Sequence, residues 1–203
     1  MGKSDLTKQR ILEAAEQEFS EKGLYGARVD EIAAKADINK RMLYQYFGNK
    51  EELYKTVLFH VYKRIADIDA LLLTDSGDSC ALVREIIRVY YDFLAQNPTF
   101  VRMIMWENLN GAQYLADSGA ADIKDPAIRA LGKIIDEGKE KGVFREDVDK
   151  TQVMLSLITF SFSYFSNIHT LSLLLKTDLG SEENMKKRVD YVANLLLNDL
   201  INS

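Results

Sequence analysis

The sequence predicts an all-α protein with two parts, an N-terminal three-helix head containing a helix-turn-helix and a larger C-terminal helical domain. Apolar residues recur every three or four positions along most of the chain, and no segment shows sustained alternation of apolar and polar residues. The two prolines, Pro98 and Pro126, each stand where a helix could begin. With 203 residues, 47% of them apolar and 28% charged, the chain can bury a substantial core and is not expected to be disordered. We place the head at residues 1–48 and the second domain at residues 49–203.

The first helix is predicted from an apolar stripe that Gly23 ends, in the position of a helix C-cap. The second helix has small side chains on its inward face, which would let another helix cross closely. In chain order the two apolar sets are Ile11, Leu12, Ala15 and Phe19, then Val29, Ile32, Ala33 and Ala36.

A turn and a third, short helix follow at once. Asp37 can adopt the left-handed backbone conformation that a tight turn needs, and Asn39 can cap the helix after it. Leu43 and Phe47, four residues apart, face inward, which leaves Lys40, Arg41 and Gln45 facing outward. This arrangement is a helix-turn-helix, although its spacing alone is equally compatible with an ordinary helical hairpin.

Local charge favours the DNA-binding interpretation. Residues 35–50 carry a net charge of +3, whereas the whole chain carries −5. Residues 1–50 have a net charge of +1 and residues 51–203 a net charge of −6. Binding to nucleic acid would therefore be confined to a patch on the head, and the acidic remainder would avoid the phosphates.

The head resembles the tetracycline-repressor (TetR) family of bacterial transcriptional regulators over residues 7–54. The matching segments are Arg10-Ile11-Leu12-Glu13-Ala14-Ala15, Phe19, Gly23, Ile32-Ala33, Leu43-Tyr44-Gln45-Tyr46-Phe47 and Lys50-Glu51-Glu52-Leu53. Three positions depart from the family pattern. Asp37 and Met42 stand where glycine or a small residue is usual, and Arg28 replaces a threonine that commonly binds phosphate.

The resemblance implies a regulator that binds a palindromic DNA operator as a dimer and, in the commoner case, represses transcription until a small-molecule effector releases it. For base contacts we expect Lys40, Arg41 and Gln45, with Asn39 near the helix start, because Arg and Lys suit guanine and Gln suits adenine. For phosphate contacts we expect Arg28, Tyr44, Tyr46 and Lys50, of which Tyr46 is partly structural.

Six further helices are expected. A long fourth helix starts at a cap formed by Asn49 and Glu52, and its apolar stripe runs from Leu53 to Leu72. After a turn cluster at residues 75–78, helices are expected near residues 79–96, 97–109, 125–141, 149–175 and 181–201. Residues 111–124 are expected to form a loop with at most a short helix.

A head of this size makes few base contacts, so useful affinity requires two heads and hence a homodimer. We expect the dimer interface in the last two helices, as the resemblance implies, at Ser156, Thr159, Ser163, Ser166, Thr170, Val189, Val192, Leu196 and Leu200. The alternative is that these stripes form only intramolecular core.

Aromatic residues are numerous enough to line an apolar effector site, with a few polar groups to orient the ligand. The expected ligand-binding residues are Phe100, Met103, Trp106, Glu107, Tyr114, Phe160, Tyr164, Phe165, Asn167 and His169. Most aromatic residues at such spacing are simply core. Glu107 in apolar surroundings would need a partner such as a ligand amine or amide, unless it faces solvent. His169 is more often a hydrogen-bonded structural histidine than a ligand.

Other functional classes find less support in the sequence. Residues 152–175 carry no charge and are long enough to cross a bilayer, but ten polar side chains dispersed through them argue for a buried helix instead. No glycine-rich phosphate loop, paired metal motif or catalytic triad spacing is present, so we do not expect an enzyme, a cofactor or a metal. Cys80 is the only cysteine, and no signal peptide is recognisable, so a cytoplasmic location is expected. A helical adaptor that binds only protein is the remaining alternative.

Overall fold

A computed structural model describes residues 2–66, 78–120 and 126–201, in which the secondary structure is helical apart from one isolated bridge between Phe144 and Ile201. The chain divides into two compact units. The head unit comprises Met1–Arg64 and Pro98–Ile123, and the body unit comprises Ile65–Asn97 and Lys124–Ser203. The head unit thus contains more than the three expected helices. The functional boundary at residue 48 stays a prediction.

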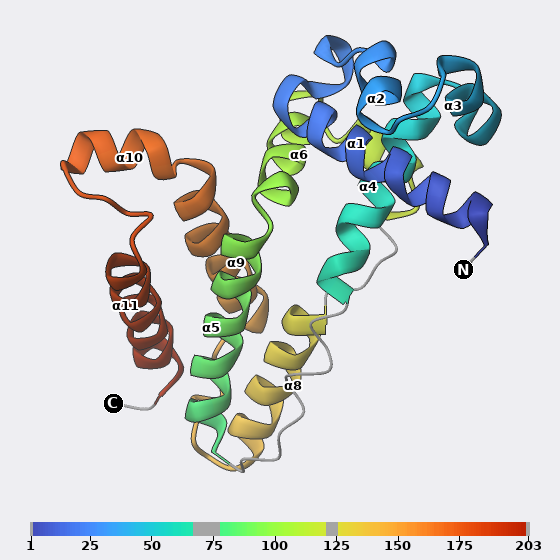
Figure 1. Ribbon diagram of the computed structural model, residues 1–203. Coiled ribbons are helices and arrows are strands. Elements are labelled where there is room, and N and C mark those ends of the chain that lie inside the picture. The colour runs from blue at the N-terminus through green and yellow to red at the C-terminus, as the bar shows by residue number, and fades with distance from the viewer. Residues whose placement is uncertain (1, 67–77, 121–125, 202–203) are drawn as a thin grey trace. The chain divides into compact units, whose positions relative to one another are not determined.

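The head unit is built around the first helix, α1 (Lys3–Gly26), against which α2 (Val29–Lys35) and α6 (Pro98–Leu109) lie (Figure 1). Its other helices are α3 (Lys40–Phe47), α4 (Lys50–Ala66) and the short α7 (Gln113–Asp117). The predicted stripes meet here, since Ile11, Phe19 and Leu53 are fully buried. The Phe19 and Tyr54 rings meet edge to face, with centroids 5.0 Å apart, so α1 and α4 share one core.

Gly23 has the positive φ (+65°) expected of it, but the chain resumes one further helical turn and α1 ends at Gly26. The reason for the glycine is a contact that the local sequence does not show. The indole of Trp106 on α6 lies over Gly23, where an added Cβ would come within 2.8 Å of it. The indole N–H also donates to the Ser20 carbonyl at 3.2 Å. These two contacts fix α6 on α1.

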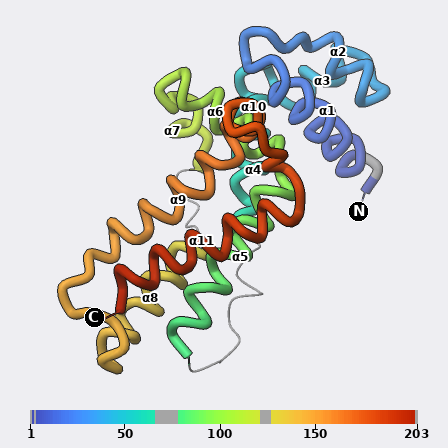
Figure 2. The backbone as a smooth tube through the Cα atoms, turned by 90° about the vertical axis from the view of Figure 1, so that its left-hand side faces the viewer, coloured from blue at the N-terminus to red at the C-terminus, as the bar shows by residue number. Residues whose placement is uncertain are grey.

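The body unit is assembled on α5 (Ser79–Gln96), which lies against three of the unit's other helices (Figure 2). These are α8 (Pro126–Glu140), α9 (Lys150–Ser166) and α11 (Glu182–Leu200), and α10 (Ile168–Leu175) contacts α9. Asp78 caps α5 and Asp149 caps α9, each through its carboxylate. The expected bounds of α5, α6, α8 and α11 are confirmed to within about two residues.

The single helix expected over residues 149–175 is wrong. The helix breaks at Asn167, whose φ of −114° and ψ of 11° leave the helical region. The Asn167 amide donates to the Ser163 carbonyl at 3.0 Å and to the Ser166 hydroxyl at 2.9 Å. Such local side-chain bonds compete with the helix, so α9 ends here and α10 starts anew. The turn cluster at residues 75–77 and the end of the fourth apolar stripe, Ile68 and Leu72, lie outside the described residues.

Candidate nucleic-acid interface

The turn between α2 and α3 has the geometry of a helix-turn-helix. Asp37 adopts a left-handed conformation with φ of 53°, as predicted, and Arg10 on α1 lies 3.8 Å from its carboxylate. The Asn39 side chain accepts the Met42 backbone N–H at 2.8 Å and so caps α3. Leu43 is fully buried and Phe47 is half-buried, so this face of α3 holds the helix on the head.

The opposite face of α3 presents Lys40, Arg41, Tyr44 and Gln45, all exposed. Within the described part of the chain, the side chains of Arg41 and Gln45 have no hydrogen-bond partner. Lys40 is paired with Asp30 of α2 at 3.0 Å, and this hydrogen bond raises the pKa of Lys40. Arg41 and Gln45 are therefore the two predicted base-reading side chains with free donors, whereas Asn39 serves α3 itself.

The predicted phosphate contacts are distributed around this face. Arg28 is exposed at the N-cap of α2, and Lys50 is the first residue of α4, directly after the cap of Asn49 on the Glu52 N–H at 2.9 Å. Burial lowers the pKa of Lys50, whose ammonium donates to the Tyr25 carbonyl at 3.5 Å. Helix N-termini of this kind favour anions.

Tyr44 is 38% exposed and available, whereas Tyr46 is half-buried and held by the start of α1. The Tyr46 hydroxyl accepts from the Ser4 hydroxyl at 3.4 Å, and the Lys8 ammonium lies 5.8 Å from the centroid of its ring. Tyr46 is therefore partly structural, as expected. Its contacts also bring Lys8, a cation that the motif-based analysis did not select, next to α3.

A buried ion cluster that the sequence analysis missed fixes α1 against α2. Glu18 is fully buried, and its carboxylate accepts from Lys22 at 2.7 Å and from Lys35 at 2.8 Å. It also accepts the Arg28 backbone N–H at 3.4 Å. Burial alone would raise the pKa of Glu18, but these hydrogen bonds lower it to about 2. The available signal was helical register, since Glu18 follows Ile11 by seven positions on the inward stripe.

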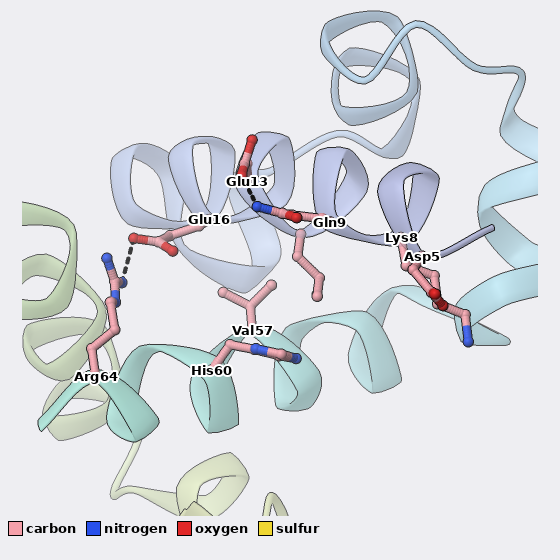
Figure 3. Close-up of a pocket in the computed structure, with 9 residues that line it drawn as sticks. Asp5, Lys8, Gln9, Glu13, Glu16, Val57, His60 and Arg64 are labelled. Atoms are coloured by element: carbon pink, nitrogen blue, oxygen red, sulfur yellow. Dashed lines mark hydrogen bonds and ion pairs between the residues drawn. The ribbon is translucent and has the colours of Figure 1, made fainter. Parts of the chain in front are cut away.

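A second ion pair borders a groove of about 540 Å³ between α1 and α4 (Figure 3). Leu12 and Val57 give it an apolar floor. At one end Arg64 of α4 pairs with Glu16 of α1 at 2.6 Å, and Thr99 of α6 donates to the same carboxylate. This cluster joins three helices of the head unit and so fixes α4 relative to α1.

A third polar cluster lies around Glu107, which is 1% exposed, so the solvent-facing alternative is excluded. Its carboxylate accepts from the Tyr54 hydroxyl of α4 at 2.9 Å and from the Leu115 backbone N–H of α7 at 2.8 Å. The Tyr114 ring lies edge to face with that of Tyr54, and the Tyr114 hydroxyl is 3.1 Å from the Tyr25 hydroxyl. The backbone carbonyl of Tyr25 is the group that accepts from Lys50. Glu107 thus has partners within its own unit and connects α6 and α7 to α4.

Comparison with known proteins agrees with this geometry. Residues 11–57 match the family described as "Bacterial regulatory proteins, tetR family", and residues 81–195 match "Tetracyclin repressor-like, C-terminal domain". The chain belongs to the TetR family. Membership identifies this TetR-family chain as a DNA-binding transcriptional regulator and not an enzyme.

Two TetR-family relatives are similar to this protein over most of its length. The HTH-type transcriptional repressor NicS of Pseudomonas putida is 33% identical over 97% of this chain and 93% of its own length. The HTH-type transcriptional repressor SCO4008 of Streptomyces coelicolor is 32% identical over 77% of each chain. The fatty acid degradation regulator FadR from Bacillus halodurans has the same fold, with a TM-score of 0.72, 20% identity and coverage of 97% of this chain and 96% of its own.

The expected ligand-binding residues of this TetR-family chain fall into two groups, one in each unit. The head-unit group lies on α6 and α7 and is used in packing, since Met103 is fully buried; it comprises Phe100, Met103, Trp106, Glu107 and Tyr114. In the body unit, Phe160, Tyr164 and Phe165 gather around Tyr91 of α5, whose ring centroid is 6.0 Å from that of Tyr164. Asn167 and His169 are exposed, and Asn167 caps the end of α9.

The residues expected at the dimer interface fall into a buried group and a more exposed group. Val192, Leu196 and Leu200 are buried inside a single chain, at most 4% exposed, so the intramolecular alternative holds for them. Val189 is half-buried. Ser156 and Ser166 are half-buried, and Thr159, Ser163 and Thr170 are exposed. Beside these, Leu155, Ile158 and Leu195 are 53%, 37% and 42% exposed, and an apolar surface on α9 and α11 therefore faces outward.

None of the helices that the structure describes is both long enough and apolar enough to cross a membrane, and this includes the uncharged segment that α9 and α10 share.

Proposed function

We propose that this TetR-family protein is a repressor that binds a twofold operator as a homodimer and is released by a small-molecule effector. The observation that carries the proposal is the exposed face of α3, where Arg41 and Gln45 have no hydrogen-bond partner among the described residues, together with the cation of Lys50 at the start of α4. Bidentate contacts from Arg to guanine and from Gln to adenine suit a major groove, and Lys50 suits a phosphate. Repression is also what the names of NicS and SCO4008 state for those proteins.

Dimerisation would use the outward apolar surface of α9 and α11. Leu155 and Ile158 on α9 and Leu195 on α11 are large apolar side chains left exposed by a chain whose other α11 leucines are buried. Exposed apolar surface of this kind marks interaction sites. A symmetric pair of heads then reads two half-sites about one helical turn apart, which gives an affinity that a single α3 cannot provide.

Effector release would act through the clusters that join α4 to the rest of the head unit. Glu107 fixes Tyr54 of α4 to α6 and α7, and Lys50 stands at the start of the same helix. A ligand that shifts α6 would therefore move α4 and the phosphate contact of Lys50. A coupling of about 1 to 3 kcal/mol would lower operator affinity roughly 5- to 150-fold. Among solved structures of the same fold, FadR of Bacillus subtilis was determined in complex with stearoyl-CoA.

The test starts with the purified full-length protein and selection of bound fragments from genomic DNA, followed by gel-shift titration at several salt concentrations. Arg41→Ala should cost about 1 to 3 kcal/mol on the selected operator and relax its sequence preference at one base pair. Lys50→Ala should weaken operator and random DNA alike and reduce the salt slope by about 1. Equal losses on both DNAs for the two variants would reject the assignment, and so would a protein that stays monomeric or selects no sequence.

A further inference from the structure

The body unit contains an arginine that is surrounded by aromatic rings and pairs with no carboxylate of the described residues. The guanidinium carbon of Arg188, on α11, lies 5.7 Å from the centroid of the Phe160 ring and 5.8 Å from that of Tyr191. Its Nε atom is buried and has no hydrogen-bond partner among the described residues. No carboxylate of the described residues forms an ion pair with it, whereas the neighbouring Lys187 is paired with Glu183 at 2.5 Å.

The guanidinium hydrogen-bonds to the Tyr91 hydroxyl, but this contact leaves the Nε–H without an acceptor among the described residues. Tyr91 donates its hydroxyl to the Phe160 carbonyl at 3.0 Å, and Tyr164 donates to the Leu179 carbonyl at 2.6 Å. Both phenols are largely buried, and burial raises the pKa of each. The charge of Arg188 opposes that rise at both phenols, and its hydrogen bond to Tyr91 opposes it further there. The cation is therefore close to both rings and yet has no carboxylate partner in the described part of the chain. Aromatic faces attract a guanidinium, but they accept its N–H groups only weakly.

Burying a guanidinium N–H without an acceptor is costly, so such a group in a native protein needs an explanation. Arg188 as a whole is only half-buried, so part of the residue reaches the surface although its Nε does not. A planar guanidinium matches a planar carboxylate through two parallel N–H···O bonds. An anion that reached the guanidinium would gain a charge-assisted contact away from bulk water.

The aromatic neighbours restrict which carboxylate fits. The ring of Phe165 lies 5.8 Å from Tyr91 and 5.4 Å from Tyr164 between centroids, and Phe160 and Phe165 are only half-buried. Partly exposed ring faces next to a cation favour a flat, apolar ligand body, because offset and edge-to-face ring pairs add to the burial of apolar area. A long aliphatic chain would gain less from these faces.

We propose that Arg188, with the rings of Phe160, Tyr164 and Phe165, forms an effector subsite for an aromatic monocarboxylate, in which the guanidinium binds the carboxylate. This inference rests on the proposed function only in calling the ligand an effector. The competing occupant is a carboxylate of a second copy of the chain, since α11 also carries part of the outward apolar surface.

The test measures binding of benzoate, phenylacetate and indole-3-acetate to the full-length protein by calorimetry, each beside its neutral amide. We expect saturable binding of at least one acid and binding of its amide weaker by about 10- to 150-fold, the range of a hydrogen bond to a charged group. Arg188→Gln should weaken the acid by the same factor and leave its amide unchanged. Lys187→Gln, which removes one charge from the next position of the same helix, should bind the acid as the wild type does.

Three results would overturn the subsite. They are no saturable binding of any of the three acids, equal affinity for acid and amide, or an Arg188→Gln variant that still binds the acid normally. Sedimentation of the same variants tests the competing occupant. If Arg188→Gln loses the dimer and the wild type binds none of the acids, the arginine belongs to the interface between copies. Operator gel shifts of the ligand-free protein are scored separately. They decide the proposed function, since a protein that binds the acid but no DNA would fail that proposal alone.

Discussion

Replacing Gly23 with alanine should destabilise the head unit strongly, for two separable reasons. Gly23 has φ of 65° and ψ of 177°, a region that is essentially restricted to glycine and costs other residues about 1 to 3 kcal/mol. The new Cβ would also come within 2.8 Å of the Trp106 indole, and overpacking of this kind costs about 1 to 3 kcal/mol more. We expect a loss of about 4 kcal/mol in the free energy of unfolding, the middle of the summed range.

Urea unfolding at one fixed protein concentration measures this loss, and fluorescence of Trp106, the single tryptophan, reports the contact directly. Gly111→Ala is the matched control, because Gly111 also has positive φ (+68°) but has nothing within 4 Å of the added Cβ. The control should lose only about 1 to 2 kcal/mol. If Gly23→Ala were no less stable than Gly111→Ala, the packing of α6 on α1 through Trp106 would not be tight, and the reasoning would be refuted.

Two further predictions concern the buried carboxylates of the head unit. Glu18 has a pKa lowered to about 2 from an ordinary value of 4.5, so its stabilisation is complete above pH 4.5 and is lost as the pH falls from 4.5 towards 2. Glu18→Gln should lower the free energy of unfolding by about 2 kcal/mol at pH 7, and urea titrations should show this difference from wild type shrinking over that acid range. Tyr54→Phe should lower the free energy of unfolding by about 1 to 3 kcal/mol, because it leaves a Glu107 oxygen buried without its donor. The same urea titration measures this loss.

Each of these two predictions has a clear contrary outcome. For Glu18→Gln it is a difference from wild type that does not change between pH 7 and pH 2, because the carboxylate would then not be the titrating group. For Tyr54→Phe the matched control is Tyr62→Phe, since the Tyr62 ring packs on Phe100 and its hydroxyl has no partner among the described residues. Equal losses from the two tyrosine variants would mean that the Glu107 contact contributes nothing.

Features set by local sequence could be predicted well. Asp37 and Asn39 act through their own backbone geometry and a cap three residues away, so the turn and the start of α3 needed no tertiary information. The stripes that bury Phe19 and Leu53 follow from a period of 3.6 residues. The break at Asn167 was missed because apolar periodicity continues across it, while the cause is a hydrogen bond made by one side chain.

Features that depend on pairing between distant residues could not be predicted. Register places Glu18 and Glu107 on inward faces, but only the fold brings Lys35 to one and Tyr54 to the other. The same holds for α11, whose apolar residues extend over more than one face. Periodicity cannot say which of its stripes packs on α5, and Val192 and Leu196 proved to be the inner set.

In the head unit, different cationic residues serve stability and DNA recognition. On the side where α1 meets α2, Glu18 holds Lys22 and Lys35, and these cations are not free for DNA. On α3, by contrast, Arg41 has no ion-pair partner among the residues that the structure describes, although an exposed ion pair would have been worth little to stability. Lys40 is less available for DNA than Arg41, because its ion pair with Asp30 must break before it can contact a base or a phosphate. Its contribution to affinity is the difference between two exposed contacts, so Arg41 and Gln45 should account for most of the discrimination made by this helix.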